Sequence, residues 1–273
     1  MNIQDTNRDS CASAFTKDFL SNGFIKFDVE ELNSLQKINY AIREIMSNVF
    51  PDNFLRLSRS SDDVFADLHK EIKVEEVNSL RLSVYNDINA LSWFREEFYK
   101  LVSMRLLNLV GDELAWQNKV NFSIMMPGDD SSNIPIHRDF HSGESLFQVV
   151  VWVPLTDAFG KNSMFIEDLS KPRVTEKQYL KWMTGGGNDN VMKNIGDRIR
   201  WIDVKYGEAL IFSPNLLHGS IPNGEKKTRC SLNLRFKSLF SPYYSTEKSI
   251  GVFYSPMKLK PVTEFALRYM SDI

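Results

Sequence analysis

The chain after residue 117 carries short apolar runs separated by turn residues, and this pattern limits the folds that it can adopt. Runs rich in Val, Ile and Phe alternate with stretches of Gly, Pro, Asn and Asp. Many short strands with such turn residues between them predict a β-sandwich or a β-barrel. One helix, over residues 175–183, is expected to interrupt the strands. The strands are expected at residues 119–126, 146–153, 163–167, 198–204, 209–213 and 229–237.

Helical periodicity dominates the first part of the chain. Apolar residues recur at helical spacing over residues 30–48, and Pro51 is expected to end this helix. Residues 62–88 look helical but interrupted. The clearest helix covers residues 91–110, because one apolar stripe runs along it. The stripe consists of Phe94, Phe98, Leu101, Met104, Leu107 and Val110.

No linker and no repeat divides the chain, so we expect one domain with an all-β core and a helical N-terminal layer. Residues 1–15 are expected to form a flexible tail, and residues 16–273 the domain. Within it we expect mainly helical support at 16–116, the β core at 117–240 and a C-terminal extension at 241–273. A last helix is expected over residues 262–271.

Composition excludes several classes of protein. The 273 residues have a formal net charge of −2, so there is no basic excess that would favour nucleic acid or a membrane surface as a partner. No apolar stretch approaches the roughly 20 residues that span a bilayer, and the N-terminus lacks the apolar core of a signal peptide. Two cysteines, Cys11 and Cys230, are too few for a disulfide scaffold. We therefore expect a soluble, cytoplasmic protein.

The histidines point to a metal site. Residues i and i+2 of an extended segment face the same way, so His137 and Asp139 can meet at one point while Arg138 faces away. With His218 they supply two imidazoles and one carboxylate, the set that binds ferrous iron on one face and leaves other positions open. An isolated His-x-Asp also arises by chance. His141 would lie about 13 Å from His137 along a strand, so we expect it to line the pocket or to lie on the surface.

The segment 229–237 alternates strictly between polar and apolar residues. Arg229, Ser231, Asn233 and Arg235 share one face, which either lies in water or lines the inside of a barrel. The guanidinium of Arg229 can bind a carboxylate through two parallel hydrogen bonds, and Ser231 can add a third. One arginine would also balance the charge of Fe²⁺, one Asp and a dicarboxylate keto acid in a dry site.

Together, His137-Arg-Asp139, His218 and Arg229-Cys-Ser231 resemble the H-x-D…H…R-x-S signature of iron(II)/2-oxoglutarate-dependent oxygenases. Flanking segments at 23–27, 151–157 and 206–212 look like their counterparts in the phytanoyl-type branch. Segments at 112–117, 127–132 and 236–243 are similar to the bacterial sporadic carbohydrate cluster oxygenases. The resemblance runs from about residue 16 to the C-terminus.

This resemblance implies a double-stranded β-helix, a cupin-like jelly roll, in which His137, Asp139 and His218 hold iron. It implies that 2-oxoglutarate and O2 are cosubstrates, that Arg229 and Ser231 bind the far carboxylate of 2-oxoglutarate, and that ascorbate activates the enzyme in vitro. Succinate and carbon dioxide would be released. Because Asp139 fills the position that related halogenases leave vacant, hydroxylation is the expected reaction. The expected substrate is a small polar molecule, a sugar or a nucleotide sugar.

Further residues are expected to line the pocket, although core packing is an equal alternative for Trp152. The residues assigned to the cosubstrate are Arg229, Ser231, Asn121 and Gln148, and those assigned to the substrate are Ser123, His141, Trp152 and Arg235. Two other functions fit the same residues. A cupin-like isomerase would use the metal only as a Lewis acid, and a non-catalytic protein would bind a sugar or keto acid without turnover.

Overall fold

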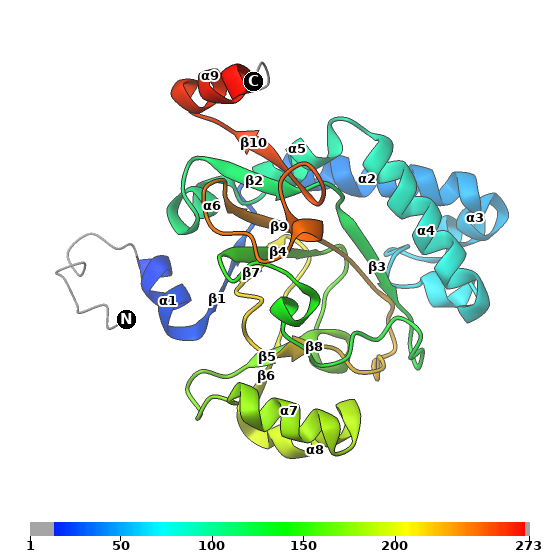
Figure 1. The fold of residues 1–273 in the computed structure, drawn as a ribbon. Coiled ribbons are helices and arrows are strands. Elements are labelled where there is room, and N and C mark those ends of the chain that lie inside the picture. Colours follow the sequence, from blue (N-terminus) through cyan, green and yellow to red (C-terminus); the bar gives the residue numbers. More distant parts are fainter. Residues whose placement is uncertain (1–13, 271–273) are drawn as a thin grey trace.

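Two antiparallel sheets form the centre of the molecule, in a computed structural model that describes residues 14–270 (Figure 1). The larger sheet has seven strands in the order β1-β7-β4-β9-β2-β10, with β3 also paired to β9. The smaller sheet has the order β6-β5-β8. The strands are β1 (Phe24–Asp28), β2 (Leu114–Gln117), β3 (Asn121–Met125), β4 (Gln148–Pro154), β5 (Met164–Glu167), β6 (Ile199–Ile202), β7 (Glu208–Phe212), β8 (His218–Gly219), β9 (Arg229–Ser238) and β10 (Tyr254–Lys258).

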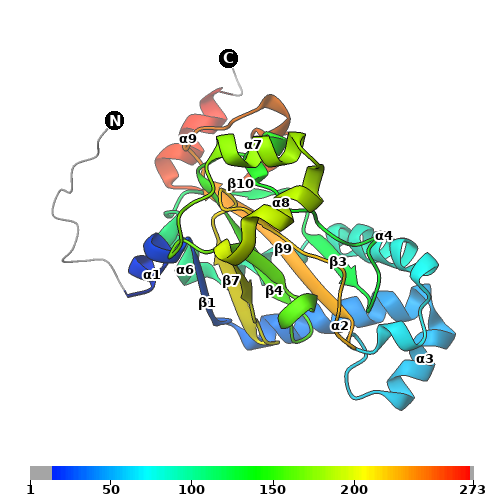
Figure 2. The same ribbon diagram turned by 90° about the horizontal axis from the view of Figure 1, so that it is seen from below.

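Helices surround these sheets. In Figure 1, α7 and α8 lie beside the small sheet, at the opposite end of the molecule from α9, and Figure 2 shows α2 running alongside the large sheet. The helices are α1 (Ala14–Asn22), α2 (Leu32–Val49), α3 (Pro51–Ser60), α4 (Val74–Ala90), α5 (Phe94–Lys100), α6 (Ser103–Leu109), α7 (Glu176–Thr184), α8 (Gly187–Ile195) and α9 (Pro261–Met270). No helix within residues 14–270 is both long and apolar enough to cross a membrane.

The large sheet is buried on both faces. Along β4, Val149, Val151 and Val153 join the core formed with the N-terminal helices, whereas Val150 and Trp152 pack toward the small sheet. This division follows from the period of two in a strand, which sends neighbouring side chains to opposite faces. The sequence-based prediction of a β core with a helical layer is confirmed, and the structure shows that the sheets are antiparallel. The two sheets do not close into one barrel in the described part of the chain.

Strand β9 shows the predicted alternation. Its apolar residues belong to the helix-facing core, and its polar residues line a cavity on the other face. The polar face is thus inside the molecule, which excludes the alternative of an ordinary strand with that face in water. The core residues are Cys230, Leu232, Leu234 and Phe236, and the cavity residues are Arg229, Ser231, Asn233 and Arg235.

The prediction of one helix over residues 91–110 is wrong. Two short helices, α5 and α6, replace it, because the backbone leaves the helical region at Val102, where φ is −143° and ψ is 10°. The break rotates the second helix relative to the first. Leu106 is therefore fully buried, whereas Met104, which belongs to the expected stripe, is 57% exposed.

Three other local expectations need correction. Pro51 does not only end a helix, because it is also the first residue of α3, where a missing backbone N–H costs nothing. Helix α8 begins at Gly187, whereas only one helix, over residues 175–183, was expected between the strands. The tail expected at residues 1–15 lies outside the described residues except for Ala14 and Phe15, which begin α1.

Candidate active site

A single backbone bridge brings two distant histidines together. The amide of His137 donates to the carbonyl of His218 at 3.0 Å, and the reverse hydrogen bond has the same length. As a result the two rings lie 4.3 Å apart between centroids. Asp139 lies two residues further along, where its amide donates to Pro214 at 3.0 Å. The structure therefore brings together all three residues that the sequence pattern selected as metal ligands.

The geometry of these three side chains suits a metal ion. Oδ1 of Asp139 lies 3.2 Å from Nε2 of His137 and 3.5 Å from Nε2 of His218, and one donor atom from each residue lies within 4.8 Å of the others. Each histidine also places Nδ1 against a backbone carbonyl, at 2.8 Å from Pro135 and 2.9 Å from Leu216. A histidine that donates from Nδ1 keeps Nε2 free for a metal. The residues present therefore fit a ferrous ion.

The charges of the site favour ligands in their metal-binding forms. Burial alone would raise the pKa of Asp139, but hydrogen bonds with His137 and His218 and the charge of Arg235 hold it far below its usual range. Burial lowers the pKa of His218, which favours the neutral imidazole. Metal ligation requires an ionised carboxylate and a neutral imidazole.

Arg235 holds the other oxygen of Asp139. Its Nε and Nη2 lie 2.9 and 2.8 Å from Oδ2, and its Nη1 donates to Gln117 at 3.2 Å. Oδ2 is therefore engaged, and Oδ1 is left to face the histidines. Arg235 lines the cavity as expected, but its guanidinium is bound to a candidate metal ligand, whereas the sequence-based hypothesis assigned it to the substrate.

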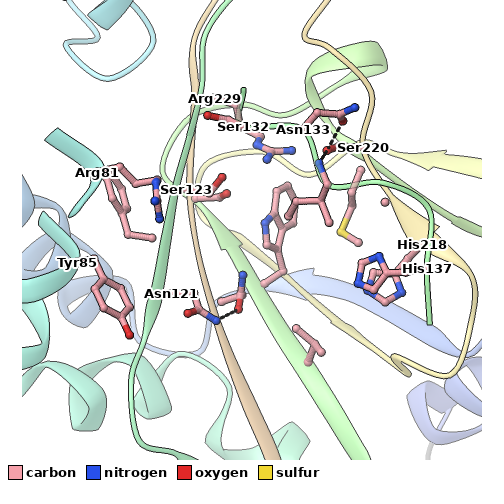
Figure 3. A pocket seen from close by; sticks show the side chains of 18 of the residues that line it. Arg81, Tyr85, Asn121, Ser123, Ser132, Asn133, His137, His218, Ser220 and Arg229 are labelled. Atoms are coloured by element: carbon pink, nitrogen blue, oxygen red, sulfur yellow. Dashed lines mark hydrogen bonds between the residues drawn. The ribbon is translucent and has the colours of Figure 1, made fainter. Parts of the chain in front are cut away.

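A cavity of about 900 Å³ opens beside the two histidines (Figure 3). Its walls come from α4, β3, β4 and β9 and from the loop that precedes the metal motif. Asn121, Ser123, Trp152 and Ser231, which the sequence assigned to the pocket, all line it. Asn121 donates to Asn233 at 2.8 Å. Core packing and pocket lining were equal alternatives for Trp152, and the structure shows both, because its side chain packs in the core between the sheets and also faces the cavity.

Arg229 is a buried charge that forms no ion pair with a carboxylate in the described part of the chain. The residue is 3% exposed, its Nη1 donates to the carbonyl of Asn162 at 3.1 Å, and its Nε has no hydrogen-bond partner. Its guanidinium lies 5.6 Å from the centre of the Trp152 ring, and burial lowers its pKa to about 10. An unpaired buried charge is costly, so this arrangement favours the binding of an anionic ligand. Ser231, 1% exposed, lies two residues along the same face.

Gln148 does not line the cavity. It lies on the same face of β4 as Trp152, but four residues away, which is about 13 Å along a strand. There it is hydrogen-bonded to the hydroxyl of Tyr254, a residue of the C-terminal extension. The assignment of Gln148 to the cosubstrate is therefore not supported by its position.

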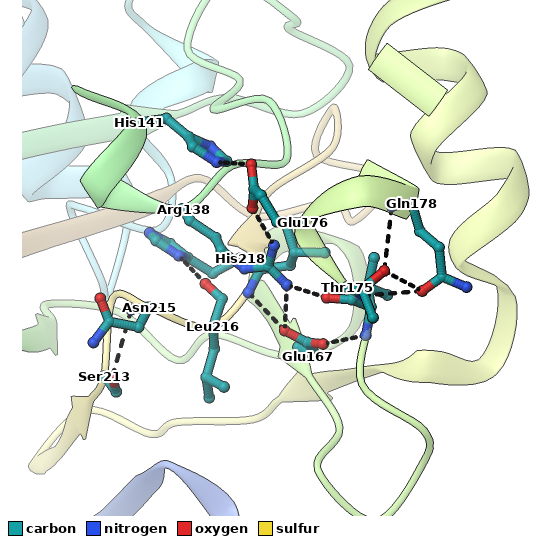
Figure 4. A network of polar contacts seen from close by, with 12 residues as sticks. Arg138, His141, Glu167, Thr175, Glu176, Gln178, Ser213, Asn215, Leu216 and His218 are labelled. Carbon is teal, nitrogen blue, oxygen red and sulfur yellow. Dashed lines mark hydrogen bonds and ion pairs between the residues drawn. The ribbon is translucent and has the colours of Figure 1, made fainter. Parts of the chain in front are cut away.

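His141 also lies outside the cavity lining. Its Nε2 is 2.8 Å from Oε1 of Glu176 (Figure 4). Its ring stacks on Tyr179 with 4.8 Å between centroids. Arg138 faces away from the metal site as predicted, but into a buried ion pair with Glu167 at 3.3 Å. His141 thus connects the segment that carries Asp139 to α7, and Arg138 connects it to β5.

Sequence reasoning missed the cavity wall formed by α4. Asn78, Arg81, Leu82 and Tyr85 line it, and Figure 3 shows Arg81 and Tyr85 across the cavity from the histidines. Their spacing of three and four residues marks one face of a helix. That pattern alone does not distinguish a cavity wall from a solvated face.

Comparison with known proteins identifies the family. The family model for phytanoyl-CoA dioxygenase (PhyH) matches residues 27–231. A search of curated protein sequences finds no match.

Solved structures share the fold at low sequence identity. The non-heme monooxygenase ThoJ in a nickel complex is 13% identical, with 94% of each chain covered and a TM-score of 0.54. EctD from S. alaskensis with 2-oxoglutarate and 5-hydroxyectoine is 16% identical, with 95% of this chain and 89% of that chain covered and a TM-score of 0.53. HygX from Streptomyces hygroscopicus with nickel and 2-oxoglutarate is 11% identical, with 90% and 98% covered and a TM-score of 0.50.

The family match covers most of the chain, and it includes all three candidate metal ligands, Arg229 and Ser231. The donor geometry and the buried guanidinium are what iron and a keto acid require. The chain belongs to the phytanoyl-CoA dioxygenase (PhyH) family and is an iron(II)/2-oxoglutarate-dependent oxygenase.

Proposed function

We propose that the protein hydroxylates a small polar, sugar-derived substrate and converts 2-oxoglutarate to succinate and carbon dioxide. One observation carries the proposal. Three metal-donor atoms lie within 4.8 Å of one another, and two of the residues that carry them, His137 and His218, border the same cavity as the buried guanidinium of Arg229. In this proposal the two sheets correspond to the two sheets of a double-stranded β-helix.

His137, Asp139 and His218 would hold the iron, which, with 2-oxoglutarate and O2, supplies the oxidising power for attack on a C–H bond. Arg235 keeps Oδ2 of Asp139 occupied, so that Oδ1 stays directed at the metal position. The backbone carbonyls of Pro135 and Leu216 fix the two imidazole rings.

Arg229 would bind the far carboxylate of 2-oxoglutarate, with Ser231 as an additional donor. The ring of Trp152 limits where the guanidinium can move, and the carbonyl of Asn162 already accepts from Nη1. The carboxylate would add an ionic partner to a guanidinium whose only hydrogen bond to the described residues is the one to Asn162.

The cavity favours a polar substrate. Asn121, Ser123, Asn133 and Ser220 offer amide and hydroxyl groups around it, and Trp152 offers an aromatic surface against which a sugar ring can pack. A long aliphatic substrate would form no hydrogen bonds with these polar groups. A sugar derivative therefore fits the lining better than a fatty acyl chain.

The direct test is succinate formation from 2-oxoglutarate with Fe(II), ascorbate and air. The wild-type protein should release succinate, and candidate sugars should raise the rate. His218→Ala should release none, whereas His69→Ala, which changes a histidine outside the cavity lining, should behave as wild type. Binding of 2-oxoglutarate without any succinate would instead favour the non-catalytic binding protein.

A further inference from the structure

One face of α4 closes the cavity on the side away from the metal ligands. Asn78, Arg81 and Tyr85 point into it, and Figure 3 shows Ser123 and Asn121 between this face and the two histidines. A molecule that reaches from the metal to α4 therefore passes these β3 side chains. The far end of such a molecule meets Arg81.

Three arginines belong to the described cavity lining, and their guanidinium groups have different partners. Arg235 is bound to Asp139 at 2.8 Å, and Arg229 is the residue that suits the far carboxylate of 2-oxoglutarate. Arg81 has one hydrogen bond, from Nη2 to Oδ1 of Asn78 at 2.7 Å, and no ion pair with any carboxylate among residues 14–270. Its remaining guanidinium donors are free to bind a ligand.

In the proposed function Arg229 would bind the far carboxylate of 2-oxoglutarate, and the keto-acid end of the same molecule would be held at the metal site of His137, Asp139 and His218. The anion that Arg81 suits must therefore come from the other substrate. We propose that the substrate to be oxidised carries an oxyanion, a phosphoryl or carboxylate group, which Arg81 binds at the α4 side of the cavity. This inference rests on the proposed function and narrows its substrate class to an acidic or phosphorylated sugar derivative.

The neighbours of Arg81 support an oxyanion site. Asn78 fixes one edge of the guanidinium, which leaves the other nitrogens oriented for a planar or tetrahedral oxyanion. Tyr85 lies one helical turn further along and lines the same wall of the cavity. A charged substrate held there would keep its neutral part directed toward His137 and His218.

The test measures binding to protein loaded with Ni(II) and 2-oxoglutarate, so that no turnover occurs. Isothermal titration calorimetry compares glucose 1-phosphate, UDP-glucose, glucuronate and glucose. At least one of the three anionic probes should bind at least about tenfold more tightly than glucose, as expected for charge-assisted hydrogen bonds. The phosphate esters and glucuronate distinguish a phosphoryl from a carboxylate preference.

Variants assign the effect to Arg81. Arg81→Gln should lose at least about tenfold in affinity for the anionic probe and keep its affinity for 2-oxoglutarate. Tyr85→Phe should lose less, and it provides a second variant whose fold is even less at risk. Arg59→Gln removes an exposed arginine from α3 outside the cavity lining and should bind as wild type.

The outcomes separate this inference from the function on which it rests. Failure to bind metal or to release succinate would contradict the proposed function. With metal and 2-oxoglutarate bound, the inference is overturned if glucose binds as tightly as the anions or if no anionic probe binds. It is also overturned if Arg81→Gln weakens 2-oxoglutarate in place of the anionic probe.

Discussion

The sequence analysis selected His218 as a metal ligand together with Asp139 and rejected His141, and the structure gives the two histidines different partners. Nε2 of His218 faces Asp139, whereas Nε2 of His141 is bound to Glu176. We therefore expect His218→Ala to abolish Fe(II) binding and His141→Ala to leave it nearly intact, as measured by calorimetric titration and metal analysis. Equal loss of iron in the two variants would refute the ligand assignment.

The two arginines of β9, Arg229 and Arg235, are expected to have different roles. Arg229→Lys keeps the charge but loses the forked donor geometry, so the Kd for 2-oxoglutarate should rise by about tenfold or more. Arg235→Lys should mainly weaken metal binding, because it alters the contact with Oδ2 of Asp139. Titration of both variants with 2-oxoglutarate and with metal checks this division. A larger effect of Arg235→Lys on 2-oxoglutarate would reverse it.

Among the helices, Glu97 of α5 joins α2. It accepts from the hydroxyl of Ser34 at 2.6 Å and pairs with Lys37 at 2.9 Å. These hydrogen bonds, with a further one from Lys100, lower the pKa of Glu97 to about 2. Because the folded-state pKa lies below the unfolded one, the stabilisation is complete above about pH 4.5 and is lost as the pH falls toward 2.

Urea unfolding as a function of pH tests this contact between α2 and α5. At pH 7, Glu97→Gln should lower the free energy of unfolding by about 1–2 kcal/mol. The difference from wild type should shrink as the pH is lowered from about 4.5. Glu44→Gln, at an exposed position of α2, serves as the control and should have little effect at any pH. A pH-independent difference for Glu97→Gln would attribute its effect to packing.

At the scale of the whole molecule, the prediction concerns the reaction product. Asp139 is present as the third candidate ligand, so the outcome should be hydroxylation, with one atom of ¹⁸O from ¹⁸O2 in the sugar-derived product by mass spectrometry. The same reaction with chloride should yield no chlorinated product. Turnover of a fatty acyl or amino-acid substrate with no sugar accepted would refute the substrate class, and a chlorinated product would refute hydroxylation.

The sequence by itself determined the features that depend on the periodicity of a strand or a helix. Alternation along β9 predicted which of its residues face the cavity, because a strand sends neighbouring side chains to opposite faces whatever packs on them. The spacing of His137 and Asp139, with a lone His218, predicted a common metal site. Helix α2 followed from its apolar spacing, whereas the break at Val102 between α5 and α6 left no mark on the periodicity.

Only the tertiary structure decided which partner each side chain meets. Gln148 and Trp152 share a face of β4, but Gln148 is hydrogen-bonded to Tyr254 of the C-terminal extension, whereas Trp152 lines the cavity. Arg235 meets Asp139, and Arg81 of α4 faces the site from more than fifty residues earlier in the chain. Periodicity reports the direction of a side chain relative to its own backbone, whereas these partners depend on how separate segments pack, which short-range sequence does not encode.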